Sequence, residues 1–411
     1  MSALVGLAFG PFELTRLIGR GGMAEVFLAQ RRDLAGSPEV VLKRLRPEVA
    51  ADVEYSRRLA LEAQLASRLS HPSIVKLLEY GRVGDCYYLA MEQVKGWSLR
   101  RLVELSMERD QPPPLGAALG IIEGILGGLS TMHAAKSDDG KPRPFLHRDV
   151  TPNNVIVDHT GRAVLIDYGI AKDVYGPSIT VVGKVVGTSR YMAPEHRLSQ
   201  RCTPRADVFS ASRICFELIT ARPPWPLLSA HRELLRVVFD PPEVTPEIEG
   251  RLPEDIRAIV WRGLACNADE RFLNATEMLE ALQASPTWAD YGQDASAQVL
   301  AWIKKLEILP DEGLLGPVID SAPARSGSGI TWSPSGQLSQ DEPDVATSVR
   351  ISQLPQASVL SIPPLPPPKK RDSIGPPSLP APAPARTPTW ILGAVGVLAA
   401  AVVFAALALS K

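Results

Sequence analysis

One stretch of this 411-residue sequence constrains the chain more than any other. Residues 145–157, FLHRDVTPNNVIV, place Asp149 and Asn154 five positions apart, and residues 163–173, AVLIDYGIAKD, place Asp167 at the end of an apolar strand. Two carboxylates and an amide grouped in this way suit oxygen ligation of a divalent metal together with one catalytic base. A purely structural role would have to explain the His-Arg-Asp triplet, the spaced asparagine and the Asp-x-Gly motif together. The pattern therefore predicts an active site.

A glycine cluster near the N-terminus predicts a site for phosphate. Residues 17–30, LIGRGGMAEVFLAQ, have apolar residues on both sides of the glycines, which is typical of a strand, a tight turn and a second strand. Glycines there let the backbone approach phosphate oxygens and offer N–H groups to them. A simple hairpin turn would also need glycine. No helical pattern follows the cluster, which argues against a Rossmann dinucleotide motif.

Lys43 lies in a short β-branched strand, residues 39–45, EVVLKRL. A lysine in such a strand usually points to solvent, and a functional role requires a carboxylate that holds it. Glu62 is the candidate, because residues 56–70, SRRLALEAQLASRLS, have apolar residues at helical spacing with Glu62 beside them.

Taken in this order along the chain, these motifs resemble those of the eukaryotic-like (Hanks-type) protein kinases, in particular their bacterial Ser/Thr branch. The resemblance covers residues 12–284, about two thirds of the chain. It implies an α+β fold of two lobes, a small β-rich N-lobe and a larger helical C-lobe. It also implies transfer of the γ-phosphate of ATP to Ser or Thr hydroxyls of proteins, with Mg²⁺ as the metal and Mn²⁺ as its alternative.

The resemblance assigns roles to individual residues. Asp149 matches the catalytic aspartate, Asn154 and Asp167 the metal ligands, and Lys43 the lysine that Glu62 holds against the α- and β-phosphates. Arg271 matches an arginine that pairs with Glu195 of the Ala193-Pro194-Glu195 motif, and Asp207 matches another structural position. The residues expected around ATP are Ile18, Gly19, Arg20, Gly21, Gly22, Met23, Ala24, Glu25, Val26, Val41, Lys43, Met91, Glu92, Val94 and Ile156.

Two features concern activity and its control. Thr151 stands where this branch usually has a lysine near the γ-phosphate, and the loss of that charge could slow transfer. An ATP-binding pseudokinase scaffold therefore remains as an alternative to an active enzyme. In the activation loop we expect autophosphorylation at Thr180 first and Ser178 second, whereas Thr188 is interpreted as a structural neighbour of Asp149.

The C-terminal part changes composition twice. Residues 285–310 are expected to form a helical extension, and residues 311–389 are rich in Pro, Ser and Ala, which predicts a disordered linker. Its PPLPPP run could instead bind a partner. Residues 390–410, WILGAVGVLAAAVVFAALALS, carry no charge and are long enough to span a bilayer of about 30 Å. Because Lys and Arg precede this segment and only Lys411 follows it, we expect a single-pass anchor in the inner membrane with the kinase domain in the cytoplasm.

Charge and cysteine content limit the partners. A formal net charge of −1 gives no electrostatic case for nucleic acid. The four cysteines form no C-x-x-C pair, which argues against zinc and against a disulfide framework and suits a reducing cytosol. The expected partners are protein substrates, the membrane and a second copy of the chain for trans-autophosphorylation.

Overall fold

The computed structural model describes residues 6–21, 24–34, 36–46, 63–137, 139–167, 188–198, 200–225, 236–237, 242–308, 310 and 347–350. The chain divides into two compact units, residues 1–356 and 357–411. Every described residue belongs to the first unit. The predicted membrane helix, residues 390–410, lies outside the described part of the chain.

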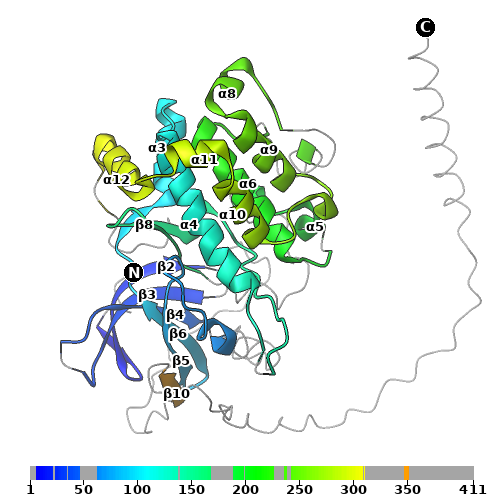
Figure 1. Cartoon of the computed structure of the whole chain (residues 1–411). Coiled ribbons are helices and arrows are strands. Elements are labelled where there is room, and N and C mark those ends of the chain that lie inside the picture. Colours follow the sequence, from blue (N-terminus) through cyan, green and yellow to red (C-terminus); the bar gives the residue numbers. More distant parts are fainter. Residues whose placement is uncertain are drawn as a thin grey trace, which may run out of the picture. The chain divides into compact units, whose positions relative to one another are not determined.

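The N-terminal lobe is an antiparallel sheet in the order β1-β2-β3-β4-β6-β5-β10 (Figure 1). Neighbouring strands are mostly consecutive in the chain, because short turns join antiparallel strands. The strands are β1 (Leu7–Phe9), β2 (Phe12–Arg20), β3 (Ala24–Arg31), β4 (Val40–Leu45), β5 (Leu77–Val83), β6 (Cys86–Glu92) and β10 (Thr347–Arg350).

Both faces of this sheet carry buried side chains, which alternate between two cores along the strands. Along β3, Val26 packs in the main core that continues into the second lobe, whereas Phe27 packs in a smaller core on the opposite face. Along β4, Val41 and Leu45 belong to the main core, and Leu42 belongs to the smaller one. Because alternate residues of a strand share a face, Lys43 lies on the face of Val41 and Leu45, toward the second lobe.

The C-terminal lobe is built around two buried helices, α4 and α6, with a small sheet in the order β7-β8-β9 beside them (Figure 1). The confirmed fold is therefore the expected α+β arrangement of two lobes. The described strands of the C-terminal lobe are β7 (Gly96–Ser98), β8 (Val155–Asp158) and β9 (Ala163–Leu165). Its described helices are α3 (Leu99–Arg109), α4 (Leu115–His133), η1 (Pro152–Asn154), η2 (Thr188–Tyr191), α5 (Pro194–Arg197), α6 (Pro204–Thr220), α8 (Pro246–Arg251), α9 (Glu254–Gly263), η3 (Ala268–Glu270), α10 (Ala275–Gln283), α11 (Pro286–Tyr291) and α12 (Ala295–Leu306).

The extension predicted at residues 285–310 contains α11 and α12. Val299, Trp302 and Ile303 of α12 are buried in the main core. α12 lies close to α4 because glycine leaves room for it: a Cβ added at Gly120 would come within 2.6 Å of the Ala295 Cβ. The extension therefore shares the core of the second lobe.

One described helix, α4, is apolar and long enough to cross a membrane. However, 72% of its most apolar window is buried inside the protein, which is typical of a core helix.

The structure corrects the linker prediction at four residues. Thr347–Arg350 lie within the stretch 311–389 that composition predicted to be disordered, yet they form β10 and pair with β5. The prediction averaged the composition over the whole stretch, which is dominated by proline and small residues. A strand of four residues changes that average very little.

Candidate active site

The hairpin between β2 and β3 carries the glycine cluster. Gly19 pairs with Val26, and the Gly21 N–H donates to the Ala24 carbonyl at 2.8 Å. A Cβ added at Gly19 would meet Val26 at 3.5 Å, and one at Gly21 would meet the Ala24 carbonyl oxygen at 3.6 Å, which are ordinary contacts. Among the residues that the structure describes, packing does not demand glycine at either position. Close approach of a phosphate to the backbone is the role that fits both.

The Glu25 side chain of the same hairpin forms ion pairs with two arginines of the sheet. Arg20 donates to its carboxylate at 2.9 and 2.6 Å, and Arg44 donates at 2.6 Å. Burial by itself raises the pKa of Glu25, but the hydrogen bonds from Arg44 and Arg20 outweigh burial and leave the pKa below its usual value. The expected contact of Glu25 with ATP is therefore limited to its backbone.

Lys43 reaches Asp167, the predicted metal ligand, across the two lobes. Its Nζ donates to both carboxylate oxygens of Asp167, at 2.9 and 2.8 Å. Both side chains are only partly exposed, 14% for Lys43 and 26% for Asp167. Glu62, the partner predicted from the sequence, lies outside the described residues, so the Lys43–Glu62 pair stays a prediction.

Asn154 joins the remaining two predicted residues. Its Nδ2 donates to the Asp149 carboxylate at 2.7 Å and to the Asp149 carbonyl at 2.8 Å. The Ile166 N–H, one residue before Asp167, donates to the Asn154 carbonyl at 3.0 Å. Residues that are far apart in the sequence are thus brought together by one series of contacts that runs from Lys43 through Asp167 and Asn154 to Asp149.

The backbone of the loop that carries Asp149 is held by the side chain of Asp207 in α6. The Asp207 carboxylate accepts from the backbone N–H groups of His147 and Arg148, both at 2.8 Å, and contacts His133 Nε2 at 3.0 Å. Arg148 has φ of +60°, a strained conformation for a residue with a side chain, and the paired N–H bonds hold it there. Burial alone raises the pKa of Asp207, but the bond to His133 and the charges of His133 and His147 lower it below its usual value.

The apolar residues expected around adenine lie in the main core. Val26, Val41, Met91 and Ile156 are all buried there, and Ile18 belongs to the same cluster. Glu92, the last residue of β6, is bonded twice to the backbone of Lys76. The Glu92 N–H donates to the Lys76 carbonyl, and the Lys76 N–H donates to the Glu92 carboxylate. The adenine-binding role of Glu92 and Val94 stays a prediction from the resemblance.

The donor set fits a magnesium ion. Both described bonds of the Asn154 side chain use its Nδ2, so its Oδ1 faces no donor in those contacts and is the atom that could ligate a metal. Asp167 supplies a carboxylate, and oxygen ligands of this kind are the ones that Mg²⁺ prefers.

Several predicted residues lie outside the described residues: Gly22, Met23, Glu62, Ser178 and Thr180. Thr188 is described by its backbone, as the first residue of η2. The predictions for these positions are therefore untested by the structure.

Comparison with known proteins identifies the family. The family model described as the protein kinase domain matches residues 12–282, more than half of the chain. This chain belongs to the protein kinase family. The expectation from the resemblance is confirmed at the level of the family.

Individual relatives give the same result. The kinase is 33% identical over 290 residues to the serine/threonine-protein kinase PknD of Mycobacterium tuberculosis, covering 70% of this chain and 42% of PknD. It is 31% identical over 279 residues to the tyrosine-protein kinase MasK of Myxococcus xanthus, covering 67% of this chain and 43% of MasK. The chain thus spans less than half the length of these two relatives.

Among solved structures, a crystal structure of a variant of the Mycobacterium tuberculosis PknI kinase domain is similar to this kinase. The TM-score is 0.50 and the identity 28%, and the match covers 69% of this chain and 98% of the PknI chain. The part that aligns is therefore essentially a whole kinase domain.

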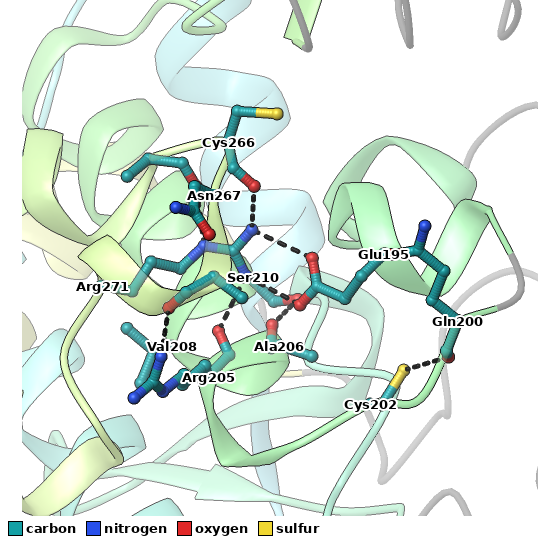
Figure 2. A network of polar contacts seen from close by, with 12 residues as sticks. Glu195, Gln200, Cys202, Arg205, Ala206, Val208, Ser210, Cys266, Asn267 and Arg271 are labelled. Carbon is teal, nitrogen blue, oxygen red and sulfur yellow. Dashed lines mark hydrogen bonds and ion pairs between the residues drawn. The ribbon is translucent and has the colours of Figure 1, made fainter.

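Arg271 lies at the centre of a network of polar contacts in the helical lobe of the kinase domain, as Figure 2 shows. Arg271 donates to both carboxylate oxygens of Glu195, at 2.8 and 3.0 Å, which confirms the predicted pair. Its other donations go to the carbonyls of Ala265, Cys266 and Arg205 at 2.7, 3.0 and 3.1 Å. The five N–H groups of a guanidinium are thereby all accounted for in a fully buried side chain.

Sequence reasoning missed a second buried network, which holds η2. The Tyr191 hydroxyl donates to Glu217 at 2.5 Å, and Arg213 donates to Glu217 at 3.1 Å and to the Arg190 carbonyl at 2.7 Å. Burial, reinforced by the charge of Glu217, raises the pKa of Tyr191 well above its usual value. A signal was present in the sequence: Arg213 and Glu217 stand four residues apart on either side of the apolar run Ile214, Cys215 and Phe216, where charges need partners.

Thr151 gives the first prediction, because its side chain is 2% exposed and its Oγ1 has no hydrogen-bond partner among the described residues. We expect Thr151→Val to leave phosphate transfer unchanged and to raise the free energy of unfolding by about 1 kcal/mol, because a buried hydroxyl without a partner costs stability. Urea unfolding and steady-state kinetics on the same samples measure both. A large fall in kcat without a loss of stability would instead mean that the hydroxyl contacts a substrate.

Proposed function

We propose that this kinase transfers the γ-phosphate of ATP to Ser and Thr hydroxyls of proteins. The observation that carries the proposal is the connected set of Lys43, Asp167, Asn154 and Asp149. The glycine hairpin that precedes β4 in the sheet supports the same function. A pseudokinase scaffold, the alternative left open by Thr151, does not require these polar groups to be assembled.

Each side chain has a defined task in the proposed mechanism. Lys43 Nζ donates to both carboxylate oxygens of Asp167, and as an ammonium it would also bind a phosphate oxygen of ATP. Asn154 orients the Asp149 carboxylate through a 2.7 Å bond, so that the carboxylate can align an acceptor hydroxyl and take its proton. A magnesium ion held by Asp167 and Asn154 would supply neutralisation of charge on the β- and γ-phosphates. Transfer then depends on positioning and electrostatics.

The relatives differ in the type of protein residue that receives the phosphate. PknD is named a serine/threonine kinase and MasK a tyrosine kinase. We favour Ser and Thr because of Thr188, the feature of the Ser/Thr branch in residues 187–195, GTSRYMAPE. Phosphoamino-acid analysis after incubation with labelled ATP and a generic protein substrate tests this. Phosphoserine and phosphothreonine are expected, and label confined to phosphotyrosine would contradict the proposal.

Regulation by autophosphorylation gives a second prediction. We expect phosphate first on Thr180 and second on Ser178, both of which precede η2 in the chain. A phosphate there would give the arginine of the His147-Arg148-Asp149 triplet a bidentate partner. Mass spectrometry of active protein, compared with protein treated with phosphatase, would detect it. Modification at neither residue would refute this scheme.

Membrane attachment gives a third prediction, resting on the uncharged segment 390–410. Residues 311–389 would allow a reach of roughly 50 Å by the square-root rule for a flexible chain. Confinement at a membrane raises the effective concentration toward membrane-bound substrates and toward a second copy. Truncation after Thr389 should move the kinase into the soluble fraction and leave its activity on a short peptide unchanged. A truncated chain that still sediments with membranes would show that the anchor lies elsewhere.

A further inference from the structure

The outermost strand of the N-terminal sheet comes from a distant part of the chain. β10 pairs with β5 in antiparallel register, Thr347 opposite Arg82, Ser348 opposite Gly81, Val349 opposite Tyr80 and Arg350 opposite Glu79. Figure 1 shows β10 beside β5 at the end of the sheet. Residue 310, which closes the helical extension, is separated from β10 by the 36 residues 311–346. A segment beyond the kinase domain thus completes the sheet of that domain.

The sequence around β10 independently has the pattern of a strand. In residues 345–352, VATSVRIS, every second residue is β-branched: Val345, Thr347, Val349 and Ile351. Period-two alternation of this kind is the signature of a strand, and β-branched residues favour strand geometry. Pro343 and Pro355 bracket the segment within an otherwise proline-rich stretch. The pattern and the pairing therefore agree.

The edge of β5 needs a partner for physical reasons. A strand with one neighbour presents a row of backbone N–H and C=O groups, which form a template for any extended peptide. β5, LLEYGRV, contains no proline that would block such pairing, and β6 occupies only its other side. A segment of the same chain has an effective concentration that a separate molecule rarely matches. The occupant is thus more readily supplied from within the chain than by a second copy.

We propose that the outer edge of β5 is a strand-docking site whose occupant is residues 347–350 of the same chain. Docking divides the stretch 311–389 and leaves only residues 351–389 between the sheet and the predicted anchor. By the square-root rule the reach falls from roughly 50 Å to roughly 34 Å. This consequence for the tether rests on the proposed membrane attachment, whereas the docking itself does not. Release of β10 would lengthen the tether and expose the β5 edge.

Cysteine pairs in the full-length chain test the register and the origin of the strand. Ser348 is directly opposite Gly81, whereas Arg350 shares a strand face with Ser348 but is displaced by two residues. In a Cys86→Ala background, Gly81→Cys with Ser348→Cys should form a disulfide much faster than Gly81→Cys with Arg350→Cys. The reason is that direct neighbours are about 5 Å apart and diagonal ones about 7–8 Å. The product should migrate as a monomer on a non-reducing gel.

Two outcomes would overturn the proposal. A dimer-sized product would place the strand on a second copy, and equal rates for both pairs would show that no fixed register exists. Neither readout depends on phosphate transfer or on membrane binding, so a failure here is distinct from a failure of the proposed function.

Proline substitutions provide a second test that introduces no cross-link. Consecutive residues of an antiparallel strand point their N–H groups alternately toward and away from the partner. Of Ser348→Pro and Val349→Pro, one therefore removes a bond to β5 and the other does not. Hydrogen exchange of residues 77–83 in the full-length chain should accelerate about tenfold in one variant and little in the other. Exchange of residues 77–83 at the wild-type rate in both variants would contradict docking.

Discussion

Replacing Lys43 with methionine is expected to reduce phosphate transfer by roughly 10²–10³-fold while the kinase domain stays folded. The Lys43 ammonium donates to both carboxylate oxygens of Asp167, the predicted metal ligand. Methionine keeps a long side chain on the same face of β4 as Val41 and Leu45, so the packing should survive. Initial rates with a peptide substrate, together with circular dichroism and a thermal melt, separate loss of chemistry from loss of fold.

The matched control is Lys305→Met. Lys305 is an exposed lysine in the last turn of α12, remote in the chain from the site, and its loss should leave the rate unchanged. A Lys43→Met enzyme that turned over as fast as this control would show that Lys43 does not bind the phosphates.

Replacing Arg271 with methionine is expected to lower the free energy of unfolding by about 3–5 kcal/mol. The change leaves the Glu195 carboxylate, 11% exposed, and three backbone carbonyls without their described donor in a buried site (Figure 2). For a domain of this size such a loss corresponds to a fall in Tm of roughly 10 °C. Urea unfolding followed by tryptophan fluorescence gives the free energy, and calorimetry gives the Tm.

An arginine on the surface provides the comparison. Arg257 pairs with Glu249 at 3.4 Å, and both side chains are substantially exposed, 34% and 56%. Arg257→Met should therefore cost less than about 1 kcal/mol. A double variant, Arg271→Met with Glu195→Leu, should be more stable than the sum of its single changes predicts, because the unpaired carboxylate is removed as well. Equal losses for Arg271→Met and Arg257→Met would refute the role given to burial.

The sequence was most informative where chemistry demands several residue types at fixed spacing. Asp149 and Asn154 are separated by one turn of η1, so their contact followed from local spacing. Arg271 and Glu195 are remote in the chain, and their pairing was predicted only through the resemblance to kinases. The strand that carries Lys43 was predicted from its β-branched residues, whereas the face on which Lys43 lies became clear only from the structure.

Other contacts could not be predicted because they depend on how the lobes and loops pack. The bond between Lys43 and Asp167 joins the two lobes, and nothing in the spacing of either residue indicates it. The Tyr191, Arg213 and Glu217 network forms because η2 lies against α6, although the charged pair among apolar residues of α6 hinted at it. β10 was missed because a short period-two pattern, residues 345–352, is a weak signal within a proline-rich segment.

The measurement that tests the central claim most directly is transfer of label from γ-³²P-ATP to a protein hydroxyl by purified wild type and by Asp149→Asn. The variant keeps the shape of the side chain but removes the base, so we expect roughly 10²–10⁴-fold less transfer with nucleotide binding retained. Asp294→Asn is the matched control, since Asp294 is exposed at the start of α12 with φ of +54°, a conformation that asparagine tolerates well. Transfer by Asp149→Asn at the rate of wild type and of this control, or no transfer by the wild type despite ATP binding, would contradict the account.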